Sequence, residues 1–264
     1  MSWRFAVSTL GMPGVPVKEA AQVATEHGCH GLEIRVHPDE ELHLGLIWSE
    51  VDRVRGQIAD AGLAVACLAG YPKVCAPGPH EPVIAELRAL IELAQRLEAP
   101  SVRVFPGGDG RDSGDGAAHE RIGAVLDDLR DTGVQLLVET HDSHPTGEAA
   151  LRLVEPFAAP KQVAVLWDAL HPWRHGEAPA RTRAVLGEYL GYFQIKDVEG
   201  PHNRTPVPPG QGGVPLAECG ELLQTWSGWV SLEWEKAWYP RIAPVTVPLR
   251  AAAAWFAQWA PGGH

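Results

Sequence analysis

Short apolar runs typical of strands alternate along the chain with longer segments in which apolar residues recur at helical spacing. The first run, at residues 4–9, is followed by a helical pattern at 17–27 that puts Ala20, Val23 and Ala24 on one face. This pair of patterns occurs eight times. The other predicted strands are 31–36, 63–69, 101–105, 134–139, 163–168, 192–197 and 229–233, and the other predicted helices are 48–61, 82–97, 117–131, 147–157, 179–190, 216–226 and 247–259.

The repeated strand–helix unit predicts one α/β domain that spans residues 1–264. The strand at 134–139 is almost apolar on both faces, which is typical of parallel strands buried on both sides. Eight such units in 264 residues fit a (β/α)8 TIM barrel. A doubly wound open sheet is the alternative, but residues 9–14 lack the glycine pattern that it needs after the first strand. Residues 201–213, rich in proline and glycine, are therefore expected to form a long active-site loop.

Composition and charge narrow the set of partners. With 45% hydrophobic and 21% charged residues, the chain can bury a large core. A net charge of −11 disfavours a nucleic-acid partner, because binding a phosphate backbone needs a basic face. Neither a membrane-spanning segment nor a signal-peptide pattern is evident, so we expect a cytoplasmic protein that does not bind membranes. A homodimer is an option that the sequence leaves open.

Polar residues stand at the ends of the last four predicted strands: Glu139, Asp168, Gln194 and Glu233. In a barrel these ends meet around one axis, where chemistry takes place. Three carboxylates near one axis repel each other unless they are protonated or bridged by a cation. Oxygen donors favour Mn²⁺ or Mg²⁺, with Co²⁺ or Zn²⁺ as alternatives. Taken singly, each acid is also compatible with a helix cap or an ion pair, and Gln194 with a hydrogen-bonding core residue.

The alternation of side chains along a strand adds two candidates. His141 is expected to share the inward face with Glu139, and Lys196 with Gln194. Lys196 then suits a substrate carboxylate or hydroxyl, with an ion pair to Glu235 or Asp168 as the alternative. His141 is expected to orient the substrate or a neighbouring carboxylate.

Five segments resemble the sugar phosphate isomerase/epimerase superfamily with a xylose-isomerase-like TIM barrel. They are Val-Glu-Thr-His-Asp (138–142), Trp-Asp-Ala-Leu-His-Pro-Trp-Arg-His-Gly-Glu (167–177), Gln-Ile-Lys-Asp (194–197), Gly-Gln-Gly-Gly-Val-Pro-Leu (210–216) and Gly-Trp-Val-Ser-Leu-Glu-Trp-Glu (228–235). The similarity of plan covers nearly the whole chain, whereas these motifs lie in its second half. They are specific for the superfamily and poorly specific for the substrate.

The resemblance implies a set of metal ligands. The usual Glu, Asp, His and Glu of the family correspond here to Glu139, Asp168, Gln194 and Glu233. Gln194 departs from the pattern, because an amide oxygen can ligate a hard cation but lacks the affinity of an imidazole for zinc. The departure implies weaker metal binding, a shift toward Mn²⁺ or Mg²⁺, or a lost metal. His171 resembles a family histidine that contacts the metal or the substrate.

The resemblance also implies an isomerase or epimerase that acts on a small sugar or sugar phosphate. One divalent metal would stabilise an enediolate, while Glu139 and Glu233 transfer the proton. The indole of Trp173 suits the apolar side of a sugar, with packing as the alternative. Arg103 and Glu33 are expected at the pocket floor. Arg204 lies in the long loop before the seventh helix, near the region where many barrels bind phosphate, but a surface arginine is the favoured interpretation, so a phosphorylated substrate is left open.

Three other functions compete with this one. A metal-dependent keto-cyclitol dehydratase of the same superfamily would use much the same residues. A DNA-repair endonuclease of similar fold needs extra histidines, and residues 68–71 after the third strand contain none. A non-catalytic ligand-binding barrel is the third rival, and Gln194 is its main support.

Overall fold

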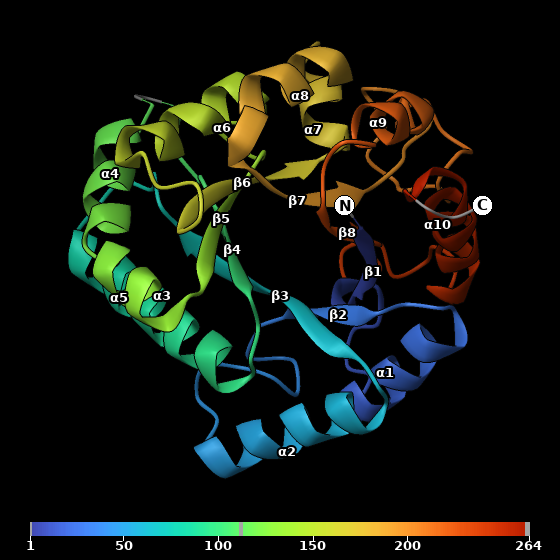
Figure 1. Ribbon diagram of the computed structural model, residues 1–264, viewed down its shortest axis with the longest axis horizontal. Helices are drawn as coiled ribbons and strands as arrows, with labels where there is room; N and C mark the ends of the chain where they lie inside the picture. Colours follow the sequence, from blue (N-terminus) through green and yellow to red (C-terminus); the bar gives the residue numbers. More distant parts are fainter. Residues whose placement is uncertain (1, 111–112, 262–264) are drawn as a thin grey trace.

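Eight parallel strands close into a barrel in the computed structural model, which describes residues 2–110 and 113–261. Each strand pairs with its neighbours in sequence, and β8 closes the ring on β1. Figure 1 shows the helices arranged around the outside of this barrel. The predicted (β/α)8 TIM barrel is therefore confirmed. The strands are β1 (Trp3–Ser8), β2 (Gly31–Arg35), β3 (Ala64–Lys73), β4 (Ser101–Phe105), β5 (Gln135–Glu139), β6 (Val163–Asp168), β7 (Leu190–Ile195) and β8 (Gly228–Leu232).

The helices cover the barrel with their apolar faces. In α2, Val51, Val54 and Ile58 are buried at helical spacing, and burying each such side chain contributes about 1.5–3 kcal/mol. The helices are α1 (Val17–Glu26), α2 (Trp48–Asp60), α3 (His80–Arg96), α4 (Asp115–Gly123), α5 (Leu126–Thr132), α6 (Gly147–Val154), α7 (Leu170–Arg174), α8 (Pro179–Leu186), α9 (Leu216–Leu222) and α10 (Thr246–Trp259), with 3-10 turns at Thr9–Gly11, Glu155–Phe157 and Gly187–Tyr189.

A second, smaller apolar cluster is formed by residues of the strands, and Trp229 and Tyr192 belong to it. The backbone of Gly31 lies so close that an added Cβ would come 2.5 Å from the carbonyl oxygen of Ala64 and 2.7 Å from the Trp229 ring. Glycine is needed there because any side chain would push the strands apart. Because the side chains of this cluster are packed together between the strands, a ligand is expected to bind at the carboxyl ends of the strands.

One predicted helix is divided in the structure, and one observed helix was not predicted. The single helix expected at 117–131 is divided into α4 and α5 around Ala124 and Val125. Gly123 weakens the helix at this point, and buried Val125 leaves helical geometry with φ −113°. The short helix α7, directly after β6, was not predicted. It begins where the Asp168 carboxylate accepts a hydrogen bond from the backbone N–H of Leu170 at 2.7 Å.

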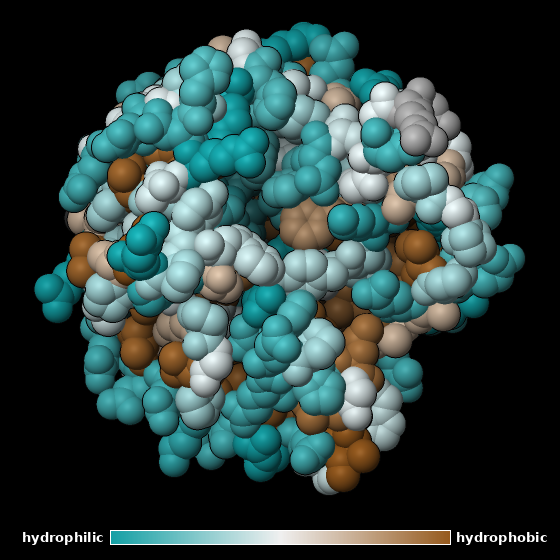
Figure 2. All heavy atoms as spheres, turned by 180° about the vertical axis from the view of Figure 1, so that it is seen from behind, coloured by the Kyte–Doolittle hydropathy of each residue, from teal (hydrophilic) through white to brown (hydrophobic). Residues whose placement is uncertain are grey.

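Figure 2 shows one face of the molecule as largely hydrophilic, with a hollow near its centre. Among the residues that the structure describes, no helix is long and apolar enough to cross a membrane.

Candidate active site

The four strand-end residues lie together at the carboxyl end of the barrel. Glu139 and Asp168 end β5 and β6, Gln194 precedes the last residue of β7, and Glu233 follows β8. Asp168 and Gln194 are direct neighbours in the register of β6 and β7. Their side chains are only 0–4% exposed. Charges this deeply buried need partners, and those partners define the site.

Lys196 supplies the positive charge between three of the carboxylates. Its ammonium lies 3.1 Å from Asp168, 2.5 Å from Glu233 and 2.8 Å from Glu235. Although burial opposes the charge, these carboxylates raise the pKa of Lys196 well above its usual range. The ion pairs considered from the sequence are thus present. They put a fixed cation between two of the four predicted metal ligands.

Arg103 is the partner of Glu139. Its Nε lies 3.1 Å from Glu139 Oε2, and its Nη1 donates to the carbonyl oxygen of Gly70 at 3.1 Å. Burial raises the pKa of the Glu139 carboxyl, whereas the Arg103 guanidinium opposes that rise. Arg103 thus contacts the candidate base Glu139.

The side-chain amide of Gln194 lies close to two buried carboxylates. Its Nε2 donates to Glu33 Oε1 at 2.9 Å and lies 3.5 Å from Glu233 Oε1. The Oε1 of Gln194 is buried and has no hydrogen-bond partner among the described residues. Glu33 is fully buried beside it. An amide oxygen left without a partner can accept a proton donor or ligate a cation.

Two histidines complete a group of donors on the pocket side of Glu139. The rings of His141 and His171 are 4.3 Å apart, and donor atoms of both lie within 4.8 Å of one another and of a Glu139 oxygen. His171 Nε2 is 3.8 Å from Asp168 Oδ2 and lacks a hydrogen bond to any described residue. Burial, with the nearby charge of His141, lowers the pKa of His171 well below its usual value. A neutral imidazole is the form that binds metals, so His171 suits a divalent ion, whereas the hydrogen bond to Asp142 raises the pKa of His141 despite its burial. By position, Glu139 and the two rings could hold one ion between them.

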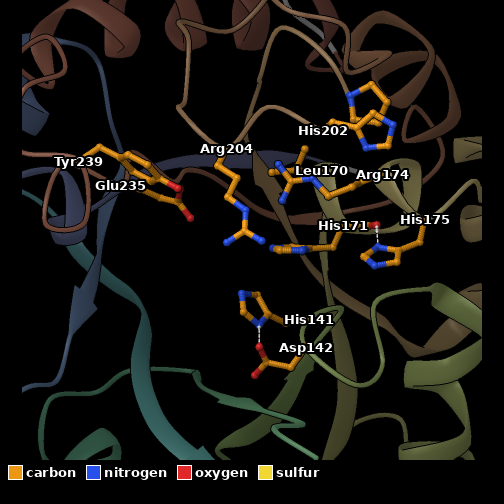
Figure 3. A pocket seen from close by; sticks show the side chains of 11 residues that line it. His141, Asp142, Leu170, His171, Arg174, His175, His202, Arg204, Glu235 and Tyr239 are labelled. Atoms are coloured by element: carbon orange, nitrogen blue, oxygen red, sulfur yellow. Dashed lines mark hydrogen bonds and ion pairs between the residues drawn. The ribbon is translucent and has the colours of Figure 1, made fainter. Parts of the chain in front are cut away.

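A pocket of about 560 Å³ opens above this group (Figure 3). His141 and His171 line it, whereas Arg103, Glu33 and Lys196 are not among its lining residues and Trp173 packs against the core. Its other lining residues come from α7 and from the loops after β5, β7 and β8. They carry no periodic signal and were not predicted as pocket residues from the sequence, apart from Arg204. They are Asp142, Leu170, Arg174, His175, Pro201, His202, Arg204, Glu235 and Tyr239.

Asp197 holds the long loop after β7. Its carboxylate accepts four backbone hydrogen bonds, at 2.9–3.1 Å, from Val198, Gly210, Gly212 and Val214. An added Cβ on Gly212 would come 2.2 Å from the Asp197 carboxylate, so glycine permits this approach. The Gly-Gln-Gly-Gly run therefore has a physical role, which is to wrap the loop around one carboxylate.

We expect Asp197→Asn to lower the free energy of unfolding by about 2–3 kcal/mol, because the amide cannot accept all four hydrogen bonds and leaves N–H groups unpaired. Urea unfolding followed by circular dichroism measures this change. Asp60→Asn, at the exposed end of α2, is the matched control and should change stability by less than about 0.5 kcal/mol. Equal stability of both variants would mean that Asp197 does not hold the loop.

Most of the chain matches a known protein family. A model that describes the xylose isomerase-like TIM barrel matches residues 21–259. The chain belongs to this family. The resemblance noted in the second half of the sequence is thereby confirmed. No curated protein matches the chain by sequence.

Several solved structures have a fold similar to that of this xylose isomerase-like barrel. The IolI protein with a bound zinc atom has a TM-score of 0.81 at 16% identity, with 97% of this chain and 99% of that chain covered. The probable 3-DHS dehydratase AsbF from Bacillus anthracis has a TM-score of 0.77 at 17% identity, covering 95% and 97%. D-psicose 3-epimerase, solved with D-fructose, has a TM-score of 0.77 at 14% identity, covering 97% and 98%. At these identities the likeness concerns the fold.

Proposed function

We propose that the chain is a divalent-metal-dependent isomerase or epimerase of a small sugar or sugar phosphate. The observation that carries this proposal is the donor group of Glu139, His141 and His171, which lies at the base of a 560 Å³ pocket at the carboxyl end of the barrel. A buried carboxylate and two imidazoles in one cluster suit a metal ion, and a pocket of this size suits a ligand of a few carbons.

Two ligand sets share Glu139. The family pattern favours Glu139, Asp168, Gln194 and Glu233, whereas the donor distances favour Glu139 with His141 and His171. Lys196 already forms ion pairs with two members of the first set. The nitrogen donors of the second set favour Zn²⁺, Co²⁺ or Mn²⁺ over Mg²⁺. When bound, such an ion would polarise the substrate carbonyl and make the neighbouring C–H more acidic.

Glu139 and Glu233 are the proposed proton carriers. They stand at the ends of β5 and β8, which are separated by two strands around the closed barrel. A substrate between them meets one carboxylate on each side. Epimerisation needs this arrangement, because the proton leaves one face of the carbon and returns to the other. Arg103 and Lys196 hold the two carboxylates in place.

A keto-cyclitol dehydratase would begin with the same proton abstraction, and the fold similarity to AsbF keeps this alternative in view. The two reactions differ in the fate of the intermediate. A dehydratase expels hydroxide and its product is lighter by one water, whereas an isomerase conserves the mass. Mass spectrometry of the product therefore separates them.

Metal titration tests the proposal. We expect purified protein to bind at least one of Mn²⁺, Mg²⁺, Co²⁺ and Zn²⁺, with a gain of about 2.7 kcal/mol in stability at a metal concentration 100 times its Kd. Calorimetry and thermal unfolding measure both effects. His171→Ala should weaken affinity at least about tenfold if the histidine set is right, since ligand changes cost this much, and Gln194→Ala should do so if the family set is right. His202→Ala, exposed in the same pocket, is the control. A protein that binds none of the four ions would end the metalloenzyme proposal.

A further inference from the structure

A tight turn follows β5, and the backbones of His141 and His144 close it. The N–H of His144 donates to the carbonyl oxygen of His141 at 2.8 Å, and the N–H of His141 donates to the carbonyl oxygen of His144 at 3.2 Å. At the corner, Asp142 has a φ of +44°, which a residue with a side chain rarely adopts. A backbone of this kind persists only where surrounding contacts hold it. The ring of His144 supplies such contacts.

The ring of His144 is fully buried and has a partner at each nitrogen. Its Nε2 lies 3.0 Å from Asp115 Oδ1, and its Nδ1 lies 2.9 Å from Ser143 Oγ. A carboxylate only accepts hydrogen bonds, so Nε2 donates to Asp115 and Nδ1 is left to accept from the Ser143 hydroxyl. The Ser143 oxygen in turn accepts from the backbone N–H of Gly108 at 2.9 Å. Each group in this chain of hydrogen bonds therefore has a defined role.

These contacts join the turn to elements outside it. Asp115 is the first residue of α4, and its Oδ2 also accepts from Arg152 Nε of α6 at 3.1 Å. Gly108 belongs to the loop after β4, and an added Cβ on it would come 2.8 Å from Ser143 Oγ. The turn is thus fixed relative to α4, α6 and the loop after β4. His144 itself is not among the residues that line the pocket.

The other end of the same turn faces the pocket. His141 and Asp142 both line it, and Asp142 Oδ1 lies 2.8 Å from His141 Nδ1 (Figure 3). The ring of His141 is 4.3 Å from the ring of His171. Because the carboxylate beside the His141 ring belongs to the turn, a change in the turn would displace both groups together.

We propose that His144 is a positioning residue for His141. It holds the turn after β5 so that the His141 ring stays beside Glu139 and His171. The inference rests on the proposed function, because a metal ion shared by these three donors is what the placement would serve. A residue outside the pocket would then control the affinity for the metal.

Zn²⁺ binding by the full chain, measured by calorimetry, tests this role. We expect His144→Ala to weaken the affinity about 10–100-fold, the usual effect of losing a residue that orients a metal-binding histidine. His144→Gln should recover part of the affinity, because its amide N–H can still donate to Asp115. Asp115→Ala removes the outer partner and leaves the turn sequence unchanged. It should weaken the affinity in the same direction, and it keeps the test valid if His144→Ala does not fold.

His30→Ala is the control for a general loss of stability. The His30 ring accepts a hydrogen bond from the backbone N–H of Phe5 at 2.9 Å, and His30 directly precedes β2, at the opposite end of the barrel. This variant should be less stable than the wild type and bind Zn²⁺ with the same affinity. Thermal unfolding of each variant measures the stability.

NMR signals of the histidine rings test the placement in the metal-free protein. The His141 signals, identified by their absence in His141→Gln, should move or broaden in His144→Ala. They should return toward the wild-type position in His144→Gln, which also lacks the ring, and stay in place in His30→Ala. His141 signals that do not move in His144→Ala, or wild-type Zn²⁺ affinity in folded His144→Ala or Asp115→Ala, would overturn the inference. A wild type that binds no metal would instead end the proposed function, and the NMR comparison would still decide whether His144 places His141.

Discussion

Lys196→Met is expected to lower the free energy of unfolding at pH 7 by about 3–5 kcal/mol, the usual cost of removing one partner from a buried ion pair. Lys196 is 1% exposed, and its ammonium is the contact shared by Asp168, Glu233 and Glu235. Methionine fills a similar volume and carries no charge. The loss therefore measures the uncompensated carboxylates and not a cavity.

The same contacts determine how the stability of the wild type and of Lys196→Met changes with pH. The raised pKa of Lys196 means that its stabilisation is fully present at pH 7 and is lost only in strong alkali. In Lys196→Met the buried carboxylates would take up protons, so the variant should approach the wild type in stability as the pH falls. Urea unfolding at several pH values measures this trend. Lys18→Met, on the exposed face of α1, is the control. A loss below about 1 kcal/mol at pH 7 would mean that the three carboxylates do not depend on Lys196.

The sequence predicted the barrel because its periodicities repeat. A β-rich run followed by a helical pattern appears eight times, and parallel strands buried on both faces leave a clear apolar signature. The predicted elements differ from the observed ones where tertiary packing overrides that pattern. The division of one predicted helix at Val125 depends on a side chain buried against the core, which no local rule reports.

The candidate site was predictable to the extent that strand ends identify it. Glu139, Asp168 and Glu233 stand at those ends, and the structure brings them to one buried region. Their partners could not be read from spacing. The contact between Lys196 and Glu233 joins different strands, and it depends on how side chains of unequal length meet across the barrel.

Loop residues were the least predictable part. His202 and Tyr239 reach the pocket from loops with no periodicity, where neither burial nor direction can be inferred from local sequence. The role of Asp197 was equally hidden, although the glycines that surround it are conspicuous in the sequence. The role of these glycines could be recognised only from the position of the Asp197 carboxylate that they approach.

Glu139→Gln and Glu233→Gln are each expected to reduce turnover by about 10²–10⁴-fold, the usual contribution of a positioned acid or base. Glutamine keeps the shape of glutamate and cannot accept the substrate proton. The assay is a screen of ketoses, ketose phosphates and inososes with Mn²⁺ in deuterated water, in which NMR follows deuterium entering the substrate. Glu221→Gln, on the exposed side of α9, is the matched control.

In each variant, the carboxylate that remains should exchange the proton on a different face of the substrate carbon. If the carboxylates at β5 and β8 meet opposite faces of one carbon, each variant loses conversion between epimers, and the remaining carboxylate still exchanges the proton of one epimer. Thermal unfolding of both proteins separates a chemical defect from a folding defect, because Glu139 and Glu233 also pair with Arg103 and Lys196. Exchange at the wild-type rate in both folded variants would remove the two glutamates as acid and base. In a variant that still binds the metal like the wild type in calorimetry, loss of exchange from both epimers would assign the whole proton transfer to that single carboxylate and exclude the two-face mechanism.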